Sequence, residues 1–264
     1  MKKYFVVGNP IEHSLSPRLH NHWIKKNNIN AFYDKKKLNE NDIEGIINEV
    51  KNGKVDGINV TVPFKKSVIP FLDELTPLAN EAQSVNTIYK QNGKVIGHNT
   101  DIGGFELSLN HINYEVKNKK IFILGAGGVA PSIIVALKKM GASRIILSNR
   151  TKKKAEDLKK IYPELEIINW GDVPDFNMII NATSLGLKKD DEIKVNYKNI
   201  VPNKLFYDVI YSPPETNFLL KAKQFGNQIE NGKMMFIYQA HQAFSIWHKI
   251  IVKIDDETIR LLNL

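Results

Sequence analysis

The chain has 264 residues, no cysteine and a formal net charge of +9, from 37 Lys and Arg against 28 Asp and Glu. The absence of cysteine excludes a disulfide framework, a thiolate zinc site, an iron–sulfur cluster and a cysteine nucleophile. Hydrophobic residues make up 42% of the chain, which is enough for ordinary cores, and at roughly 150 residues per domain the length favours two domains.

The positive charge and the first residues do not indicate nucleic-acid binding, export or membrane insertion. The lysines fall in short runs without interleaved aromatic residues, so we expect an ordinary solvated surface. The chain begins with only five apolar residues before Asn9 and Pro10, fewer than the roughly 7–15 of a signal-peptide core. The apolar segment 234–252 is interrupted by two glutamines, two histidines and a lysine, which predicts a soluble helix. We therefore expect a cytoplasmic protein that binds neither membranes nor nucleic acid.

In chain order, the first part of the sequence alternates strands and helices. We predict strands over 3–8, 31–37 and 57–62, helices over 17–27, 40–51 and about 65–71, a hairpin of strands 85–89 and 94–98, and a helix over 101–109. Ser16 before Pro17 is typical of a helix N-cap. The segment Gln91-Asn92-Gly93 is typical of a hairpin turn.

A second series of strand–helix units begins at residue 120. We predict strands over 120–124, 144–148, 165–169, 177–181 and 205–210, and helices over 128–139, 151–161, 215–225, 232–249 and 255–263. Repeated units of this kind predict an α/β fold of two domains with mainly parallel sheets, divided near residues 101–118. Ligands bind such sheets beyond the carboxyl ends of the strands, so the residues that follow each strand are the candidates for function.

A glycine-rich turn follows the first strand of this second series. It reads Gly125-Ala126-Gly127-Gly128-Val129-Ala130 and opens a predicted helix. Glycine lets the backbone approach a pyrophosphate, and the helix N-terminus supplies amide donors. The spacing departs from the usual dehydrogenase form because Gly128 directly follows Gly127 and Ala130 takes the third position. A purely structural turn is the alternative, but the strand–turn–helix context favours dinucleotide binding.

The next strand ends at Asn149-Arg150-Thr151, and three lysines follow at 152–154. A site for NAD has an acidic residue here that accepts hydrogen bonds from the ribose 2′-hydroxyl, and this segment has none. The planar fork of Arg150 suits a phosphate. Such a contact, worth about 1.5–3 kcal/mol, would favour NADP roughly 10- to 150-fold. We predict NADP as the cofactor; the alternative is a solvated lysine run with Thr151 as a helix cap.

Polar residues also gather at the strand ends of the first part. Ser14 follows the first strand, and Asn59 and Thr61 share one face of the third. Lys65 begins a predicted helix, where the helix dipole disfavours a cation, and this cost suggests a functional role. Asp101 alone would be explained as a helix N-cap. Together, these hydroxyl, amide, lysine and aspartate groups suit a small polyhydroxylated substrate and proton transfer by a Lys/Asp pair.

Nine short segments contain these motifs. They are SLSP at 14–17, NVTVPFK at 59–65, VNT at 85–87, NTD at 99–101, GAGGVA at 125–130, NRT at 149–151, NATSLG at 181–186, YDVIYSPPET at 207–216 and GKMMFIYQA at 232–240. In this order and spacing they resemble the shikimate dehydrogenase family over essentially the whole chain. The resemblance implies reversible NADPH-dependent reduction of 3-dehydroshikimate to shikimate, in aromatic amino-acid biosynthesis, by a monomer or homodimer.

The resemblance also implies domains and site residues. Residues 1–101 with 236–264 would form the substrate-binding and catalytic domain, and 102–235 a Rossmann-type NADP-binding domain, with a cleft between them. Lys65 and Asp101 would be catalytic. The substrate would contact Ser14, Ser16, Thr61, Lys65, Asn86, Asp101, Tyr211 and Gln239. The cofactor would contact Gly125, Ala126, Gly127, Gly128, Val129, Asn149, Arg150, Thr151, Lys154, Ile210 and Gly232, with Thr183 near the nicotinamide.

Three alternatives are less consistent with the sequence. A quinate/shikimate dehydrogenase is disfavoured because Ser14 and Ser16 are both serine and no acid follows strand 144–148. A non-catalytic NADP-binding regulator is disfavoured by the presence of both Lys65 and Asp101. The seven histidines show no HExxH pattern, so we expect no metal. Oxidation of the substrate needs a neutral Lys65 as base, and we expect its rate to rise with pH well above neutrality.

Overall fold

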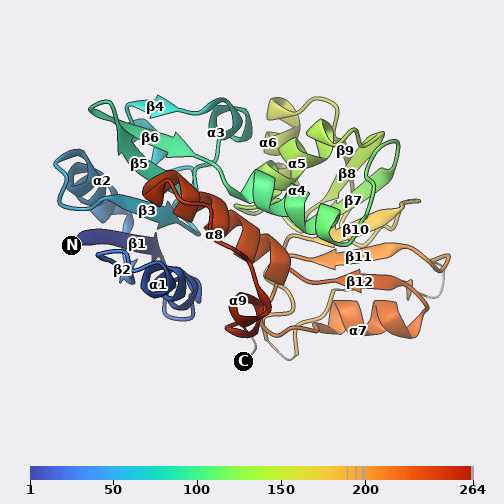
Figure 1. Cartoon of the computed structure of the whole chain (residues 1–264). Coiled ribbons are helices and arrows are strands. Elements are labelled where there is room, and N and C mark those ends of the chain that lie inside the picture. Colours follow the sequence, from blue (N-terminus) through green and yellow to red (C-terminus); the bar gives the residue numbers. More distant parts are fainter. Residues whose placement is uncertain (189, 194, 198–199, 263–264) are drawn as a thin grey trace. The chain divides into compact units, whose positions relative to one another are not determined.

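The computed structural model describes residues 1–188, 190–193, 195–197 and 200–262. The chain divides into two compact units, which Figure 1 colours along the sequence. Unit 1 comprises residues 1–105 and 237–264, and unit 2 comprises residues 106–236. Residues 263 and 264, where the predicted substrate domain and the predicted last helix end, lie outside the described residues.

Unit 1 contains a six-stranded sheet in the order β2-β1-β3-β5-β6-β4. The strands are β1 (Lys2–Gly8), β2 (Ala31–Lys37), β3 (Gly57–Val60), β4 (Glu74–Leu75), β5 (Thr87–Gln91) and β6 (Lys94–His98). Strands β1, β2 and β3 are parallel, whereas β5 is antiparallel to both β3 and β6. The hairpin predicted between β5 and β6 is confirmed: Asn92 and Gly93 have φ of 51° and 80°, as a type I′ turn requires.

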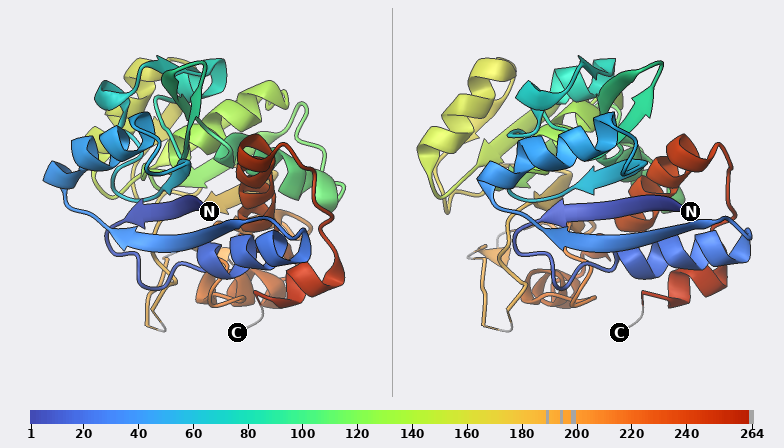
Figure 2. Two further views of the ribbon diagram at one scale, coloured as in Figure 1. Left: turned by 60° about the vertical axis from the view of Figure 1, so that its left-hand side comes forward. Right: turned by 90° about the vertical axis from the view of Figure 1, so that its left-hand side faces the viewer.

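Alternate side chains of β1 face different helices. Tyr4 stacks on Trp247 of α8 (Lys233–His248), with ring centroids 4.9 Å apart. Val7, on the opposite face, belongs to the core cluster that contains Ile46 of α2 (Ile43–Lys51). Figure 2 shows α1 (Ser16–Lys26) and α2 on opposite sides of β1 and β2. Gly57 of β3 is needed for this packing, because a Cβ there would lie 2.4 Å from Nε1 of Trp247.

Unit 2 contains an all-parallel sheet in the order β12-β11-β10-β7-β8-β9. Its strands are β7 (Lys120–Leu124), β8 (Arg144–Ser148), β9 (Glu166–Ile168), β10 (Met178–Asn181), β11 (Leu205–Asp208) and β12 (Gln228–Glu230). The strand order reverses between β7 and β10, as in the Rossmann fold, and ligands bind beyond the carboxyl ends of the strands at such a point. The predicted fold class, with two mainly parallel α/β domains, is confirmed.

Helices cover both faces of this second sheet. They are α4 (Asp101–His111, shared with unit 1), α5 (Ala130–Lys139), α6 (Lys152–Ile161) and α7 (Asn217–Gln224). On β11, Phe206 packs with Phe218 of α7, whereas the hydroxyl of Tyr207 lies 2.8 Å from that of Ser108 in α4. Because neighbouring residues of a strand point to opposite faces, these contacts place α7 and α4 on different sides of the sheet.

Two predictions about local structure are wrong. Residues 62–68 form turns, and only the 3-10 helix η2 (Ile69–Phe71) replaces the helix expected over 65–71. Pro70 contributes to this, because it lacks the amide donor that a regular helix over 65–71 would need at that position. Lys65 therefore does not begin a helix, and the argument from the helix dipole fails. Ser16 is not a side-chain cap, and neither is Thr151, which the alternative interpretation of the lysine run had as a cap.

The failed caps have different causes. Helix α1 begins at Ser16 itself, and Leu15, in the N-cap position, already has helical dihedral angles. Ser14 supplies the local contact instead, because its Oγ accepts a hydrogen bond from the Ser16 amide at 3.4 Å. Thr151 has an extended backbone at the start of α6 but makes no capping side-chain hydrogen bond.

Five short elements were not predicted separately. These are η1 (Glu40–Asp42), β4, α3 (Pro77–Ala82), η2 and β12, and they are too short to carry a periodic sequence signal. The chain ends in α9 (Asp256–Arg260), which is shorter than the helix expected over 255–263. None of the helices in the described part of the chain, α8 included, is both long and apolar enough to cross a membrane.

Candidate active site

Lys65 and Asp101 form a largely buried ion pair in unit 1. Lys65 lies in the turn that follows β3, and Asp101 is the first residue of α4, close after β6. The Nζ of Lys65 donates to Oδ2 of Asp101 at 2.6 Å, and the two side chains are only 13% and 9% exposed. Partial exclusion of water strengthens the attraction between these charges and fixes the ammonium group in place.

Asn86 holds the other oxygen of the aspartate. Its Nδ2 donates to Oδ1 of Asp101 at 2.9 Å, and its Oδ1 accepts the Thr100 amide at 2.7 Å. The backbone donor fixes which way the amide of Asn86 points. Asp101 is not occupied as a helix cap, because the amide of Ile102 donates to Oδ1 of Asn99 at 3.2 Å. The carboxylate of Asp101 is therefore directed at Lys65 and Asn86.

This network extends through two buried residues to β2. Tyr33 donates its hydroxyl to Oδ1 of Asn59 at 2.7 Å. Asn59 in turn donates Nδ2 to the carbonyl of Asn86 at 3.0 Å and to the hydroxyl of Thr87 at 3.1 Å. Burial raises the pKa of Tyr33 well above its ordinary value, so the hydroxyl stays a donor. Tyr33 was not predicted; the sequence offered only a tyrosine beside Phe32 in the otherwise polar strand AFYDKKK.

The remaining predicted substrate residues of unit 1 come from separate segments. Ser14 and Ser16 follow β1, and Gln239 lies half-buried on α8. Thr61 donates its amide to the carbonyl of Val7 at 2.9 Å, beside the end of β1. Gly8 permits this approach, since a Cβ on it would lie 2.5 Å from Cγ2 of Thr61.

Tyr211, the last of the predicted substrate residues, belongs to unit 2. Its ring lies against that of Phe236, with centroids 4.6 Å apart. The structure therefore brings Lys65, Asn86 and Asp101 into direct contact within unit 1, and it places Tyr211 in the other unit.

The glycine turn of unit 2 lies where the strand order reverses. Gly125 has φ of +106°, which favours glycine, and a Cβ on it would lie 2.7 Å from Cγ2 of Thr183 in the loop after β10. Residues 125–129 of the turn precede the N-terminus of α5. Asn149 joins this turn to the end of β8: its Oδ1 accepts the Ala126 amide at 2.9 Å, and its Nδ2 donates to the carbonyl of Thr151 at 2.7 Å. This geometry offers backbone amides to an anion at a helix N-terminus.

The cationic residues after β8 are exposed. Among the described residues, no carboxylate forms an ion pair with Arg150 or with the lysines at 152–154, although Arg144 of β8 pairs with Glu166. Their positive charge is therefore available to a phosphate group. No acidic residue stands between 149 and 155 to accept hydrogen bonds from a free ribose hydroxyl.

Ile210 and Gly232 are also close together in unit 2. The amide of Gly232 donates to the carbonyl of Ile210 at 3.1 Å. A Cβ at residue 232 would lie 2.0 Å from the carbonyl oxygen of Val209, so only glycine fits. The cofactor residues predicted from these two segments thus form one local structure after β11.

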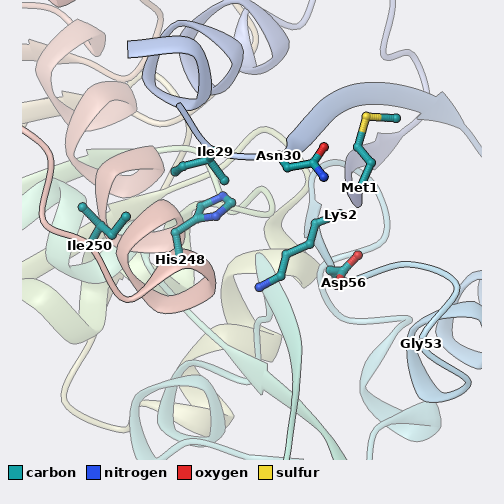
Figure 3. Close-up of a pocket in the computed structure, with 8 residues that line it drawn as sticks. All are labelled: Met1, Lys2, Ile29, Asn30, Gly53, Asp56, His248 and Ile250. Atoms are coloured by element: carbon teal, nitrogen blue, oxygen red, sulfur yellow. The ribbon is translucent and has the colours of Figure 1, made fainter. Parts of the chain in front are cut away.

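Two other features of unit 1 lie outside this site. His22, Asp255 and Glu257 offer ligand atoms within 4.8 Å of one another, but Lys26 already donates to both carboxylates, at 2.8 and 2.9 Å. A cavity of about 500 Å³ shown in Figure 3 is lined by Met1, Lys2, Ile29, Asn30, Gly53, Asp56, His248 and Ile250. This lining includes none of the predicted site residues.

Comparison with known proteins relates this geometry to a family. Residues 6–88 match the shikimate dehydrogenase substrate binding domain, and residues 106–185 match the shikimate/quinate 5-dehydrogenase domain. Shikimate dehydrogenase (NADP(+)) of Pelagibacter ubique is 61% identical over 264 residues, covering 100% of both chains. Shikimate dehydrogenase of Aquifex aeolicus, solved by crystallography, is 39% identical with a TM-score of 0.90, covering 100% of this chain and 96% of that one. Shikimate 5-dehydrogenase of Thermus thermophilus, solved in complex with NADP(H) and shikimate, is 26% identical with a TM-score of 0.90, covering 100% and 99%. The chain therefore belongs to the shikimate dehydrogenase family.

Proposed function

We propose that the chain catalyses the reversible NADPH-dependent reduction of 3-dehydroshikimate to shikimate, with the substrate on unit 1 and NADP on unit 2. One observation carries the proposal: a largely buried lysine is held by a carboxylate at 2.6 Å, in a chain of this family. Such a pair supplies and orients a proton donor without a metal.

The residues of unit 2 fit NADP. When bound, NADPH supplies a hydride to the carbonyl carbon of the substrate. Asn149 keeps the turn from Gly125 to Val129 in place by accepting the Ala126 amide, and the amides after Ala126 would bind the pyrophosphate. Arg150, Thr151 and Lys154 would hold the 2′-phosphate, and Thr183, Ile210 and Gly232 would lie at the nicotinamide.

Lys65 supplies the proton in the reducing direction. Negative charge develops on the carbonyl oxygen of the substrate during reduction, and the Nζ of Lys65 would transfer its proton to that oxygen. Asp101 orients the ammonium group and balances its charge before the transfer. In the oxidising direction Lys65 takes the proton from the substrate hydroxyl.

Substrate recognition uses hydroxyl and amide groups. Those of Ser14, Ser16, Thr61, Asn86, Tyr211 and Gln239 suit a substrate that carries several hydroxyls and a carboxylate. Asn86 has a double role, because it also holds Asp101.

The test is a turnover assay on the purified chain with shikimate and NADP, following the formation of reduced nicotinamide. Parallel assays use NAD in place of NADP and quinate in place of shikimate. We expect turnover with shikimate and NADP and far slower turnover in either parallel assay. Equal rates with quinate or NAD would contradict the substrate or cofactor assignment, and NADP binding without turnover would favour a regulator.

The location and the assembly state belong to the same proposal. We propose a cytoplasmic enzyme that acts as a monomer or homodimer. Light scattering after size-exclusion chromatography measures the mass in solution, and a trimer or larger assembly would contradict this part.

A further inference from the structure

Asp208 is a buried acidic residue that the proposed reaction does not use. It lies at the carboxyl end of β11, and none of its surface is exposed. Within the described part of the chain it forms no ion pair with a cationic side chain, and burial raises its pKa to about 6. A buried carboxylate is costly unless several donors compensate it, so its hydrogen bonds identify what it holds.

Three donors from three different segments converge on Asp208. Its Oδ1 accepts Nδ2 of Asn181, at the end of β10, and the amide of Ile210, in the loop after β11, both at 3.0 Å. Its Oδ2 accepts the hydroxyl of Thr216 at 2.6 Å, at the start of α7. One side chain therefore joins the end of β10, the loop after β11 and the start of α7 at the carboxyl edge of the sheet.

Asn181 extends this connection to Thr183. Its Oδ1 accepts both the amide of Thr183 at 3.0 Å and the hydroxyl of Thr183 at 2.7 Å. Because Nδ2 of Asn181 donates to Asp208 and to the carbonyl of Leu185, the amide can point in only one direction. Asp208 thus determines where the Thr183 side chain lies, facing the glycine turn at Gly125.

We propose that Asp208 is a positioning residue for the nicotinamide half of NADP(H). It holds Thr183 through Asn181, and it holds Ile210 through the backbone amide. Asp208 also supports the position of Gly232 through Ile210, because the Gly232 amide donates to the Ile210 carbonyl. The inference rests on the proposed function, which places these residues at the nicotinamide.

The test is Asp208→Asn, which keeps the shape but leaves one acceptor oxygen where the carboxylate has two. We expect kcat/KM for NADP to fall about 10-fold or more, equivalent to about 1.4 kcal/mol, while KM for shikimate stays within about twofold. With NADPH deuterated at the transferred position, we expect a larger isotope effect than in the wild type. A misaligned nicotinamide slows hydride transfer, which then limits the rate.

Thr216→Val is the matched control. It removes one donor to Asp208 and the cap of α7, where the Leu219 amide bonds to Oγ1 at 3.4 Å, but it leaves Asn181 and Ile210 in place. We expect it to lower Tm without changing KM for NADP or the isotope effect. If both variants change the kinetics equally, or if Asp208→Asn behaves as the wild type, the proposal is overturned.

Two further experiments cover the cases in which Asp208→Asn does not fold or the wild type is inactive. If Asp208→Asn does not fold, Asn181→Ala breaks the link to Thr183 and leaves Asp208 with its other donors, and we expect the same kinetic change. If the wild type does not oxidise shikimate, the proposed function fails separately. Titration with NADPH, followed by its fluorescence, then decides: weaker binding by Asp208→Asn than by Thr216→Val supports the proposal, and equal binding refutes it.

Discussion

The carboxylate of Asp101 has a second hydrogen-bond partner and the Nζ of Lys65 has none within the described residues, so replacing Asp101 should lower the free energy of unfolding more than replacing Lys65 does. At 2.6 Å and an effective dielectric constant of about 20, their attraction is about 6 kcal/mol before desolvation is subtracted. Removal of one partner from a buried pair typically costs about 3–5 kcal/mol. Asp101 has further support from Nδ2 of Asn86 at 2.9 Å and from its place at the start of α4. Within the described residues, the Nζ of Lys65 has no second hydrogen-bond partner.

We therefore expect Asp101→Asn to lower the free energy of unfolding by about 3–5 kcal/mol, since it leaves a lysine charge without compensation. Lys65→Met should cost about 2 kcal/mol less, because a charge-assisted hydrogen bond of about 1.5–3 kcal/mol and the helix N-terminus still support Asp101. The double variant should recover part of the loss, with a coupling of about 1–3 kcal/mol.

The free energies of unfolding of the two single variants and the double variant are measured by urea unfolding, with tryptophan fluorescence as the signal. Two of the three tryptophans, Trp23 and Trp247, belong to unit 1, so the signal reports mainly on the unit that holds the pair. Lys66→Met is the control, because Lys66 is the exposed neighbour of Lys65. Equal costs for the two single variants, or additive costs in the double variant, would refute the reasoning.

Four further predictions can be measured independently. Lys65→Ala should lower kcat by about 10²–10⁴ with a smaller change in KM; a loss carried wholly by KM would make Lys65 a binding residue. Tyr33→Phe leaves Oδ1 of Asn59 buried without its donor, so it should lower both Tm and kcat/KM for shikimate. The control Tyr207→Phe removes a buried hydroxyl in unit 2 and should lower Tm alone. Burial and the nearby His248 lower the pKa of His20 from 6.5 to about 3, so below pH 6.5 the unfolded chain binds a proton that the folded chain does not. The free energy of unfolding should therefore fall by up to about 1.4 kcal/mol per pH unit as the pH drops from about 6.5 toward 3. His20→Phe should reduce this slope in urea titrations, and an unchanged slope would contradict the prediction. Arg150→Ala should raise KM for NADP about 10-fold or more with little effect on NAD, and equal effects on both cofactors would exclude a 2′-phosphate contact.

Local signals in the sequence were sufficient for the fold class. Alternating strands and helices predicted two mainly parallel α/β domains, and Asn92-Gly93 predicted the hairpin turn because few other residue pairs adopt positive φ twice in succession. The glycine turn followed from the same reasoning, since Gly125 needs a backbone conformation that other residues rarely adopt.

Contacts between distant residues could not be obtained in this way. Lys65 and Asp101 are 36 residues apart, and Tyr33 reaches Asn59 across the sheet, so their hydrogen bonds depend on strand order and register. Asp208 is part of a quoted motif, and the Ile210 amide is a local donor to it, yet its bond to Asn181, 27 residues away, forms only after folding. The helix cap predicted at Ser16 and the alternative cap at Thr151 are both absent, because capping depends on backbone angles and side-chain direction and not on residue type alone. Local sequence signals thus determined most of the elements and the glycine turn. Only tertiary packing decided which polar groups meet, because each buried polar group bonds to the partner that the completed sheet brings to it.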